Sequence, residues 1–105
     1  MGVNAILTSI KKVYDSSSLS VANGQTAYDV RGTGGMFDNV KEATYLNIRT
    51  DKTITIYLNA TGNDGIVLAS TDSPFVISPD MGLRVKEIFI ANASGATATV
   101  QIIMT

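Results

Sequence analysis

Apolar and polar residues alternate along most of the chain, which is the pattern of β-strands that bury one face. The clearest example runs from Thr44 to Asn59 (TYLNIRTDKTITIYLN), where two alternating arms flank a short polar stretch. A three-residue loop, Thr50-Asp51-Lys52, places Ile48 opposite Ile54 and keeps the apolar residues of both arms on one face. The pattern therefore predicts a β-hairpin over these residues.

The same register predicts what lies on the other face of this hairpin. Tyr45 comes opposite Tyr57 at the end far from the loop, and the remaining positions are polar. Two facing tyrosines have three interpretations: a pair that stabilises the hairpin, anchors for a protein interface, or a platform that stacks on sugar rings. The absence of tryptophan weighs against the sugar platform, so we rank it below the other two.

Turn-forming residues divide the rest of the chain into further short strands. Asn23-Gly24 predicts a second, smaller hairpin between LSVA and TAYDV, and Ser94-Gly95 predicts a last hairpin between LRVKEIFIANA and ATATVQIIMT. IVLAS and FVIS are predicted to be single strands, and Pro74 and Pro79 bound the second of them. The polar run from Asp15 to Ser18 is predicted to be a loop.

Two segments show helical features instead. In residues 1–15 the apolar side chains recur every three or four positions, which favours a short amphipathic helix with Asn4 as its cap. A strand remains the alternative there, because Ile, Val, Thr and Tyr all favour strands. MFDNVKEA is predicted to hold one helical turn with Asp38 as its cap. The apolar positions of the first segment are Val3, Ile6, Leu7, Ile10, Val13 and Tyr14.

These elements predict an all-β fold. We expect a compact antiparallel β-sandwich of about seven or eight short strands, with a jelly-roll-like arrangement as one form of it. The 105 residues suit one domain, since two domains would each be too small to bury a good core. We expect residues 1–15 to form an N-terminal helix or arm and residues 16–105 to form the sandwich.

The composition excludes several classes of function. The chain has no histidine and no cysteine, so His-dependent triads, thiol proteases, disulfides and the usual zinc sites are excluded. Most of the nine acidic residues lie in predicted turns, where aspartate is favoured for its local backbone hydrogen bonds. We therefore expect a protein that is not an enzyme and has no catalytic, cofactor-binding or metal-binding residues.

Three short motifs have ordinary explanations. The glycines of RGTGGMF lack the Lys-Ser or Lys-Thr ending of a phosphate loop. Asn59, Asn63 and Asp64 offer oxygen ligands for calcium, but they lack EF-hand spacing and are common turn formers. Asn59-Ala-Thr61 and Asn92-Ala-Ser94 match the acceptor pattern for N-glycosylation, which is short enough to occur by chance.

Charge is sparse and scattered. The net charge is −1, and Lys11 and Lys12 are the only adjacent basic residues, so we expect no nucleic-acid partner. No apolar run approaches the ~20 residues that cross a bilayer, and no signal peptide is indicated. Charged residues make up 16% of the chain, against about 25% in typical soluble domains. This suits a surface partly covered by other protein, although many small Thr- and Gly-rich β domains share it.

Two strands near the C-terminus are apolar on both faces: Ile88 to Ala91 (IFIA) and Ile102 to Met104 (IIM). A sandwich buries only one face of each sheet, so the N-terminal helix, a loop or a neighbouring chain must cover the other face. The residues that we expect at an interface are Ile6, Ile10, Tyr45, Tyr57, Ile88, Ile90 and Ile103.

Three phrases of the sequence carry a resemblance. LSVANGQTAYDVRGTGGMF, YLNIRTDKTITIYLN and EIFIANASGATATVQIIM resemble small β-sandwich structural proteins of tailed bacteriophages. The resemblance implies a virion protein, assembled in the host cytoplasm, that acts as a symmetric homo-oligomer, with a trimer favoured. Such proteins carry no active site, so the resemblance transfers no functional residues.

We therefore expect a virion structural protein, foremost a capsid decoration or cement protein that binds itself and the major capsid protein or other virion proteins. A head–tail, baseplate or fibre adaptor is the first alternative. A carbohydrate- or receptor-binding module with exposed tyrosines is the second, and a subunit that lends only structure to a metabolic or signalling enzyme is the third. We expect no membrane partner and no cofactor.

Overall fold

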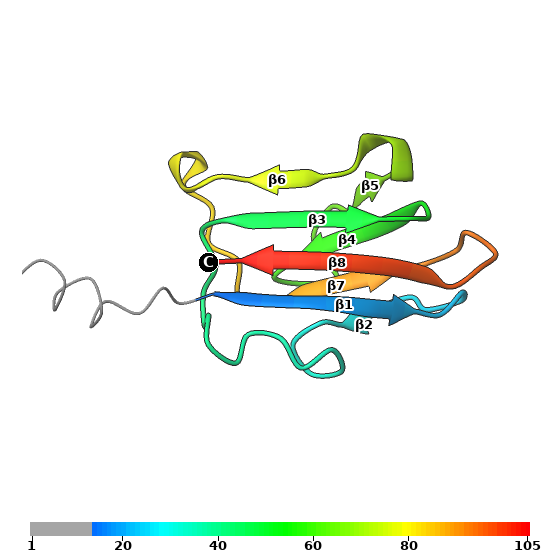
Figure 1. Cartoon of the computed structure of the whole chain (residues 1–105), viewed down its shortest axis with the longest axis horizontal. Coiled ribbons are helices and arrows are strands. Elements are labelled where there is room, and N and C mark those ends of the chain that lie inside the picture. Colours follow the sequence, from blue (N-terminus) through cyan, green and yellow to red (C-terminus); the bar gives the residue numbers. More distant parts are fainter. Residues whose placement is uncertain (1–13) are drawn as a thin grey trace, which may run out of the picture.

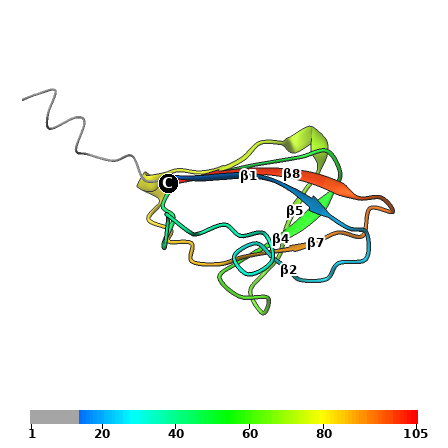
Figure 2. The same cartoon turned by 60° about the horizontal axis from the view of Figure 1, so that its bottom comes forward.

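The computed structural model describes residues 14–105, which form two four-stranded antiparallel sheets. Figure 1 shows one sheet in front of the other, and Figure 2 shows the two layers from a second direction. The predicted all-β class and number of strands are confirmed for this part of the chain. The predicted N-terminal helix lies outside the described residues except for its last two positions, and the second of these, Asp15, already belongs to a strand.

The strands alternate between the two sheets along most of the chain. Sheet A contains, in spatial order, β1 (Asp15–Val21), β8 (Ala98–Met104), β3 (Leu46–Thr50) and β6 (Phe75–Ile77). Sheet B contains β2 (Tyr28–Asp29), β7 (Ile88–Ala91), β4 (Ile54–Leu58) and β5 (Ile66–Leu68). Two short 3-10 turns, Ser70–Asp72 and Pro79–Met81, flank β6.

The inward faces of the two sheets form one apolar core. In β8 the residues Ala98, Val100, Ile102 and Met104 are completely buried, and the residues between them are exposed. Burial at every second position follows from the two-residue period of a strand. These four side chains therefore share the inward face of the strand.

The three predicted hairpins are wrong, because the two arms of each belong to different sheets. β3 pairs with β8 and β6, whereas β4 pairs with β7 and β5. The loop between β3 and β4 therefore crosses from sheet A to sheet B. Asn23-Gly24 and Ser94-Gly95 lie in similar crossings, from β1 to β2 and from β7 to β8. Within the described strands, only β4 and β5 are both consecutive and paired.

Alternation alone does not distinguish a hairpin from such a crossing. The sequence predicts Ile48 and Ile54 side by side on one sheet. In the structure both are buried, but they enter the core from opposite sheets. Both arrangements bury the same residues, and only the partner strands differ.

The predicted loop from Asp15 to Ser18 is also wrong, because these residues begin β1. This strand pairs with β8 along its whole length, from Asp15 opposite Met104 to Val21 opposite Ala98. Its serines at alternate positions face solvent, where a strand needs no apolar side chain.

The segment MFDNVKEA forms no helix in the structure. It runs as an irregular loop whose apolar side chains Met36, Phe37 and Val40 are buried in the core. The backbone N–H of Val40 donates to Asp15 Oδ2 at 2.8 Å, which ties the loop to the start of β1. The predicted cap, Asp38, is exposed.

An ion-pair cluster lies where this loop ends. Ala43 forms a single antiparallel bridge with Val85. Beside it, Glu42 Oε1 accepts a hydrogen bond from Arg84 Nη1 at 3.0 Å, and Glu42 Oε2 lies 3.5 Å from Lys86 Nζ. The hydrogen bond from Arg84, with the nearby charges of Lys86 and Arg84, holds the pKa of Glu42 below its ordinary value of 4.5.

The lowered pKa predicts a pH dependence of stability. Because the folded chain favours the ionised carboxylate, Glu42 stabilises it above about pH 4.5, and this contribution is lost as the pH falls through the lower, folded-state pKa. We expect Glu42→Gln to lower the urea midpoint at pH 7 and to lower it less at pH 3. Glu87→Gln, which removes a carboxylate outside this cluster, is the control. An equal loss at both pH values would contradict the prediction.

Candidate interaction surfaces

The described residues contain no cluster with obvious chemistry. Within residues 14–105, no three histidine, cysteine or acidic side chains are placed to hold a metal ion. Two of the three side chains considered for calcium bond to backbone atoms: Asn59 Oδ1 accepts from Lys86 N at 2.7 Å, and Asn63 Nδ2 donates to Leu58 O at 2.8 Å. The outer surfaces of the two sheets are therefore the candidates for function.

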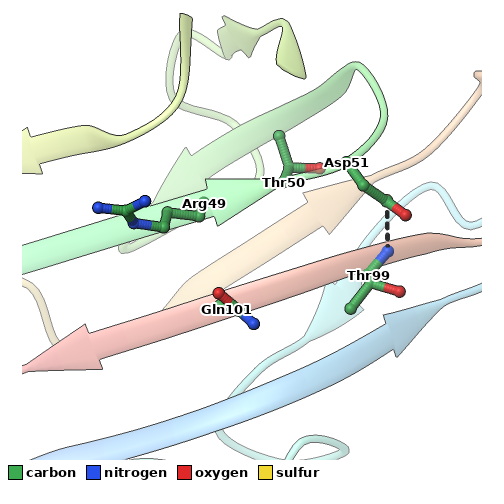
Figure 3. A pocket seen from close by; sticks show the side chains of 5 residues that line it. All are labelled: Arg49, Thr50, Asp51, Thr99 and Gln101. Atoms are coloured by element: carbon green, nitrogen blue, oxygen red, sulfur yellow. Dashed lines mark hydrogen bonds between the residues drawn. The ribbon is translucent and has the colours of Figure 1, made fainter. Parts of the chain in front are cut away.

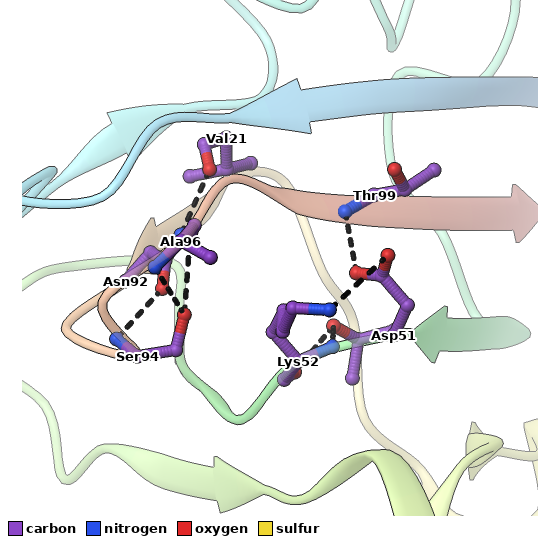
Figure 4. A network of polar contacts seen from close by, with 8 residues as sticks. Val21, Asp51, Lys52, Asn92, Ser94, Ala96 and Thr99 are labelled. Atoms are coloured by element: carbon purple, nitrogen blue, oxygen red, sulfur yellow. Dashed lines mark hydrogen bonds and ion pairs between the residues drawn. The ribbon is translucent and has the colours of Figure 1, made fainter.

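The second glycosylation motif lies at a buried position. The side chain of Asn92 is completely buried, and its amide donates to Val21 O and to Ala96 O, both at 2.8 Å (Figure 4). An amide in this position is inaccessible to a glycosylating enzyme in the folded chain. The motif therefore reflects a structural asparagine.

Tyr45 and Tyr57 do not form the predicted pair. Tyr45 directly precedes β3 in sheet A, and Tyr57 lies on β4 in sheet B. The two rings therefore belong to opposite outer faces of the molecule, and a shared sugar platform is excluded. The partner of Tyr57 across the strands is Phe89 on β7.

Sheet A presents a weakly charged outer face. Its outward strand positions carry mainly Ser, Thr, Asn and Gln, and Arg49 is the only charged residue among them in the described strands. The end of this face near the start of β1 is apolar. We call this end the apolar band, and its residues are Tyr14, Tyr45, Val76 and Ile103.

The strand register connects the residues of the apolar band. Ile103 on β8 lies between Ser16 on β1 and Asn47 on β3, and Asn47 is in turn paired with Val76 on β6. The hydroxyl of Tyr45 accepts a hydrogen bond from Asn47 Nδ2 at 3.3 Å. The band is open to solvent, with exposed fractions of 51% for Tyr14, 48% for Ile103 and 40% for Val76.

A hollow of about 530 Å³ lies within the band. Its walls combine an aliphatic side chain and two tyrosines with the hydroxyls of Ser16 and Thr105. The lining residues are Tyr14, Ser16, Tyr45, Ile103 and Thr105.

A second hollow, of about 350 Å³, lies toward the other end of the same face (Figure 3). In Figure 3, Asp51 reaches from the β3–β4 loop to β8, where its Oδ1 accepts a hydrogen bond from Thr99 N at 2.7 Å. The carboxylate thus holds the loop to the strand. Arg49 and Gln101 line the same hollow from neighbouring strands.

Sheet B also carries apolar residues on its outer face. Tyr57 on β4 is paired with Phe89 on β7. Two residues earlier on β4, Thr55 lies between Ala91 on β7 and Val67 on β5. Val67 is 69% exposed, and the others are half-buried. We call this surface the sheet B patch, and its residues are Thr55, Tyr57, Val67, Phe89 and Ala91.

Gly65 allows the ring of Tyr57 to lie close to the backbone of the sheet. A Cβ atom at position 65 would lie 2.6 Å from Thr55 Cγ2 and 3.0 Å from Tyr57 Cε1. We therefore expect Gly65→Ala to displace the Tyr57 ring and to destabilise the chain by about 1–2 kcal/mol. Near-UV circular dichroism and urea unfolding measure the two effects. Gly62→Ala is the matched control, because its Cβ would meet nothing within 4 Å, and equal results for both variants would contradict the prediction.

The structure separates the residues expected at an interface. Ile103 and Tyr45 belong to the apolar band, and Tyr57 belongs to the sheet B patch. The expectation for Ile88 and Ile90 is corrected, because both are completely buried in the core of a single chain. Ile6 and Ile10 lie outside the described residues.

Sequence reasoning missed four outward apolar residues. IFIA is apolar on both faces, and alternation does not reveal which face is inward. Phe89 is the large outward member of that strand, together with the small Ala91, whereas Ile88 and Ile90 are inward. The strand pattern alone did not distinguish the other three either. The residues that were missed are Tyr14, Val67, Val76 and Phe89.

Comparisons with known proteins add no assignment. No protein-family model matches the sequence, and no curated protein is significantly similar to it. No helix among residues 14–105 is long and apolar enough to span a membrane.

Proposed function

We propose that the protein is a structural component of a virion, foremost a capsid decoration or cement protein. In this role it acts as a homo-oligomer, with a trimer favoured, and stabilises the head through contacts with neighbouring shell proteins. It works by surface burial and performs no catalysis.

The strand order supports this proposal. We infer that the orders β1-β8-β3-β6 and β2-β7-β4-β5 make the chain a jelly roll, in which eight strands form two sheets through Greek-key connections. Jelly rolls occur in viral capsid proteins, but also in lectins and cupins. The fold alone does not decide between these functions, so the proposal depends on the surfaces.

The observation that carries the proposal is the composition of the two outer faces. Arg49 in sheet A and Asp29 in sheet B are the only charged residues at outward strand positions of the described sheets. Apolar side chains are exposed on both faces, including Val67 and Ile103. Depletion of charge around exposed apolar and aromatic groups is the signature of the core of a protein interface.

The sheet B patch is the surface that we assign to the shell. Its two aromatic residues lie side by side, and Val67, the most exposed large apolar residue of the described chain, borders them. Burial of such a cluster in a partner removes apolar area from water, which is the main driving force for association. A negative charge introduced at position 67 would oppose that burial, because a charge is costly to remove from water.

Binding to virion heads that are prepared without this protein tests the proposal. We expect purified protein to co-sediment with such heads in a saturable manner and to raise the temperature at which they rupture. Val67→Asp is expected to weaken this binding at least tenfold, or by about 1.4 kcal/mol. Thr71→Asp, in an exposed 3-10 turn away from both sheets, is the matched control. A monomer that binds no virion part contradicts the proposal, whereas binding to necks, baseplates or fibres supports the adaptor alternative.

A glycan-binding module is the second candidate. The hollow of about 530 Å³, with two tyrosines and the hydroxyls of Ser16 and Thr105 in its walls, has the size of a small-molecule site. Glycan-array binding that is lost in Tyr45→Ala and kept in Tyr57→Phe would favour this function over a structural one.

A further inference from the structure

We propose that residues 3–13 of one copy of the chain cover the apolar band of a second copy. This inference deepens the proposed function and rests on it, because it names one contact by which the homo-oligomer is held together. The contact would join the N-terminal arm, residues 1–13, to Tyr14, Tyr45, Val76 and Ile103 of its neighbour.

The apolar band has the properties of a surface that is covered in use. Ile103 lies near the end of the inner strand β8 and is 48% exposed, although the solvated face of an antiparallel sheet usually carries polar residues. The neighbouring outward positions of β8, Thr99 and Gln101, are polar. The apolar character is thus confined to one end of the face, where the hollow of about 530 Å³ also lies.

The place where the described chain begins identifies the arm as the occupant. Tyr14 directly precedes β1 and lines the hollow beside Ser16. The thirteen residues before it therefore start at the border of the apolar band. They are rich in the aliphatic side chains that such a surface takes up, namely Val3, Ile6, Leu7, Ile10 and Val13.

The arm is long enough to reach a neighbour. Thirteen residues span up to about 43–47 Å when extended. The outer strands of a four-stranded sheet are only about 14–15 Å apart, given a strand spacing of ~4.8 Å. An arm that leaves at β1 can therefore cross the full width of sheet A in a copy that lies alongside.

The sequence favours a neighbour over the same copy. An arm that covers its own sheet must reverse direction close to Tyr14. Gly, Pro, Asn and Asp, the strongest turn formers, are all absent from residue 5 to residue 14, where Thr8 and Ser9 are the only weaker ones. Reciprocal exchange of arms between two copies is an isologous contact, whereas passing each arm to the next copy is a heterologous contact that closes into a ring, such as a trimer, when the rotation permits.

Cysteine cross-linking tests the exchange, because the chain contains no cysteine of its own. Two single variants, Ile10→Cys and Ile103→Cys, are mixed and oxidised mildly, and the disulfide-linked heterodimer is measured by non-reducing electrophoresis and mass spectrometry. The matched control replaces Ile103→Cys with Val67→Cys, an exposed position on the other sheet.

We expect at least fivefold more heterodimer with Ile103→Cys than with Val67→Cys. Equal yields overturn the proposal. The double variant Ile10→Cys/Ile103→Cys separates the two directions of binding: a disulfide confined to single chains means that the arm covers its own copy, which also overturns it.

Light scattering of full-length variants gives a second measure. Ile6→Asp/Ile10→Asp and Ile103→Asp are each expected to shift the oligomer toward monomer at equal concentration, whereas Thr99→Asp, on the polar part of the same face, is expected to leave it intact. Circular dichroism checks that each variant is folded. Folded variants that remain oligomeric overturn the proposal.

The outcomes for the arm and for the virion role can be told apart. If the arm variants are monomeric and still bind heads, both proposals stand, with the sheet B patch as the shell contact. If cross-linking succeeds and no virion part is bound, the virion function fails and the exchanged arm remains. If heads are bound and cross-linking fails, only the arm is overturned.

Discussion

Replacing Asn92 with alanine is expected to lower the free energy of unfolding by about 3–4 kcal/mol. The side chain is completely buried in the crossing between β7 and β8. It donates to Val21 O and Ala96 O, both at 2.8 Å, and its Oδ1 accepts from Ser94 N at 3.0 Å (Figure 4). Alanine removes this partner from Val21 O, from Ser94 N and from Ala96 O, of which Ala96 O keeps a hydrogen bond from Ser94 Oγ at 3.0 Å. An unpaired buried group costs about 1–3 kcal/mol.

Urea unfolding followed by circular dichroism measures this loss. Asn23→Ala is the matched control, because Asn23 is exposed and accepts a single hydrogen bond, from Gly95 N at 2.9 Å. We expect it to cost less than about 1 kcal/mol. A loss of similar size in both variants would show that the buried network around Asn92 is not what holds the crossing.

Asp15→Ala is expected to destabilise the chain by about 3 kcal/mol, since hydrogen bonds to a charged group contribute about 1.5–3 kcal/mol each. The Asp15 carboxylate is buried at the start of β1. It accepts hydrogen bonds from Val40 N at 2.8 Å, from Asn39 N at 3.2 Å and from Asn39 Nδ2 at 3.1 Å. Without it, the loop that covers the core with Met36 and Phe37 loses its tie to the sheet.

Asp15→Asn provides a graded comparison, because the amide keeps one acceptor oxygen and loses the charge. We expect its midpoint in urea to lie between those of the wild type and Asp15→Ala. Asp38→Ala, at an exposed position in the same loop, is expected to change the midpoint little. If Asp15→Ala unfolds at the wild-type urea concentration, the carboxylate does not hold the loop.

The positions of most strands were predictable, because burial at every second residue is a local property. Ala98, Val100, Ile102 and Met104 carry that signal within one short stretch of sequence. β1 lacked this alternation, because serines fill most of its positions and a strand needs apolar residues only on its inner side. The tie from Asp15 to residues 39 and 40 also lies in no local pattern, since 24 or more positions separate the partners.

The pairing of the strands could not be predicted for a physical reason. A turn such as Asn23-Gly24 reports that the chain reverses, but not whether the second arm pairs with the first or crosses the core. That choice depends on which distant strand occupies the neighbouring edge, as β8 does for β1. The predicted pair of Tyr45 and Tyr57 was wrong for this reason, because it assumed that β3 pairs with β4.

The candidate surfaces were predictable in kind but not in detail. Two-sided apolar strands correctly pointed to exposed apolar residues, and Ile103 is one of them. In IFIA both faces are apolar, so the choice of Ile88 and Ile90 over Phe89 had no basis in alternation. Only the burial of each residue in the fold decides it.

The position of β8 has a consequence for synthesis of the chain. Of the eight described strands it is the last to be made, yet it lies between β1 and β3 and joins them. Until residues 98–104 leave the ribosome, those two strands have no common partner. The apolar side chains of the core therefore stay accessible to chaperones and proteases. We therefore expect a chain that is truncated before β8 to be degraded rather than to form a smaller folded protein.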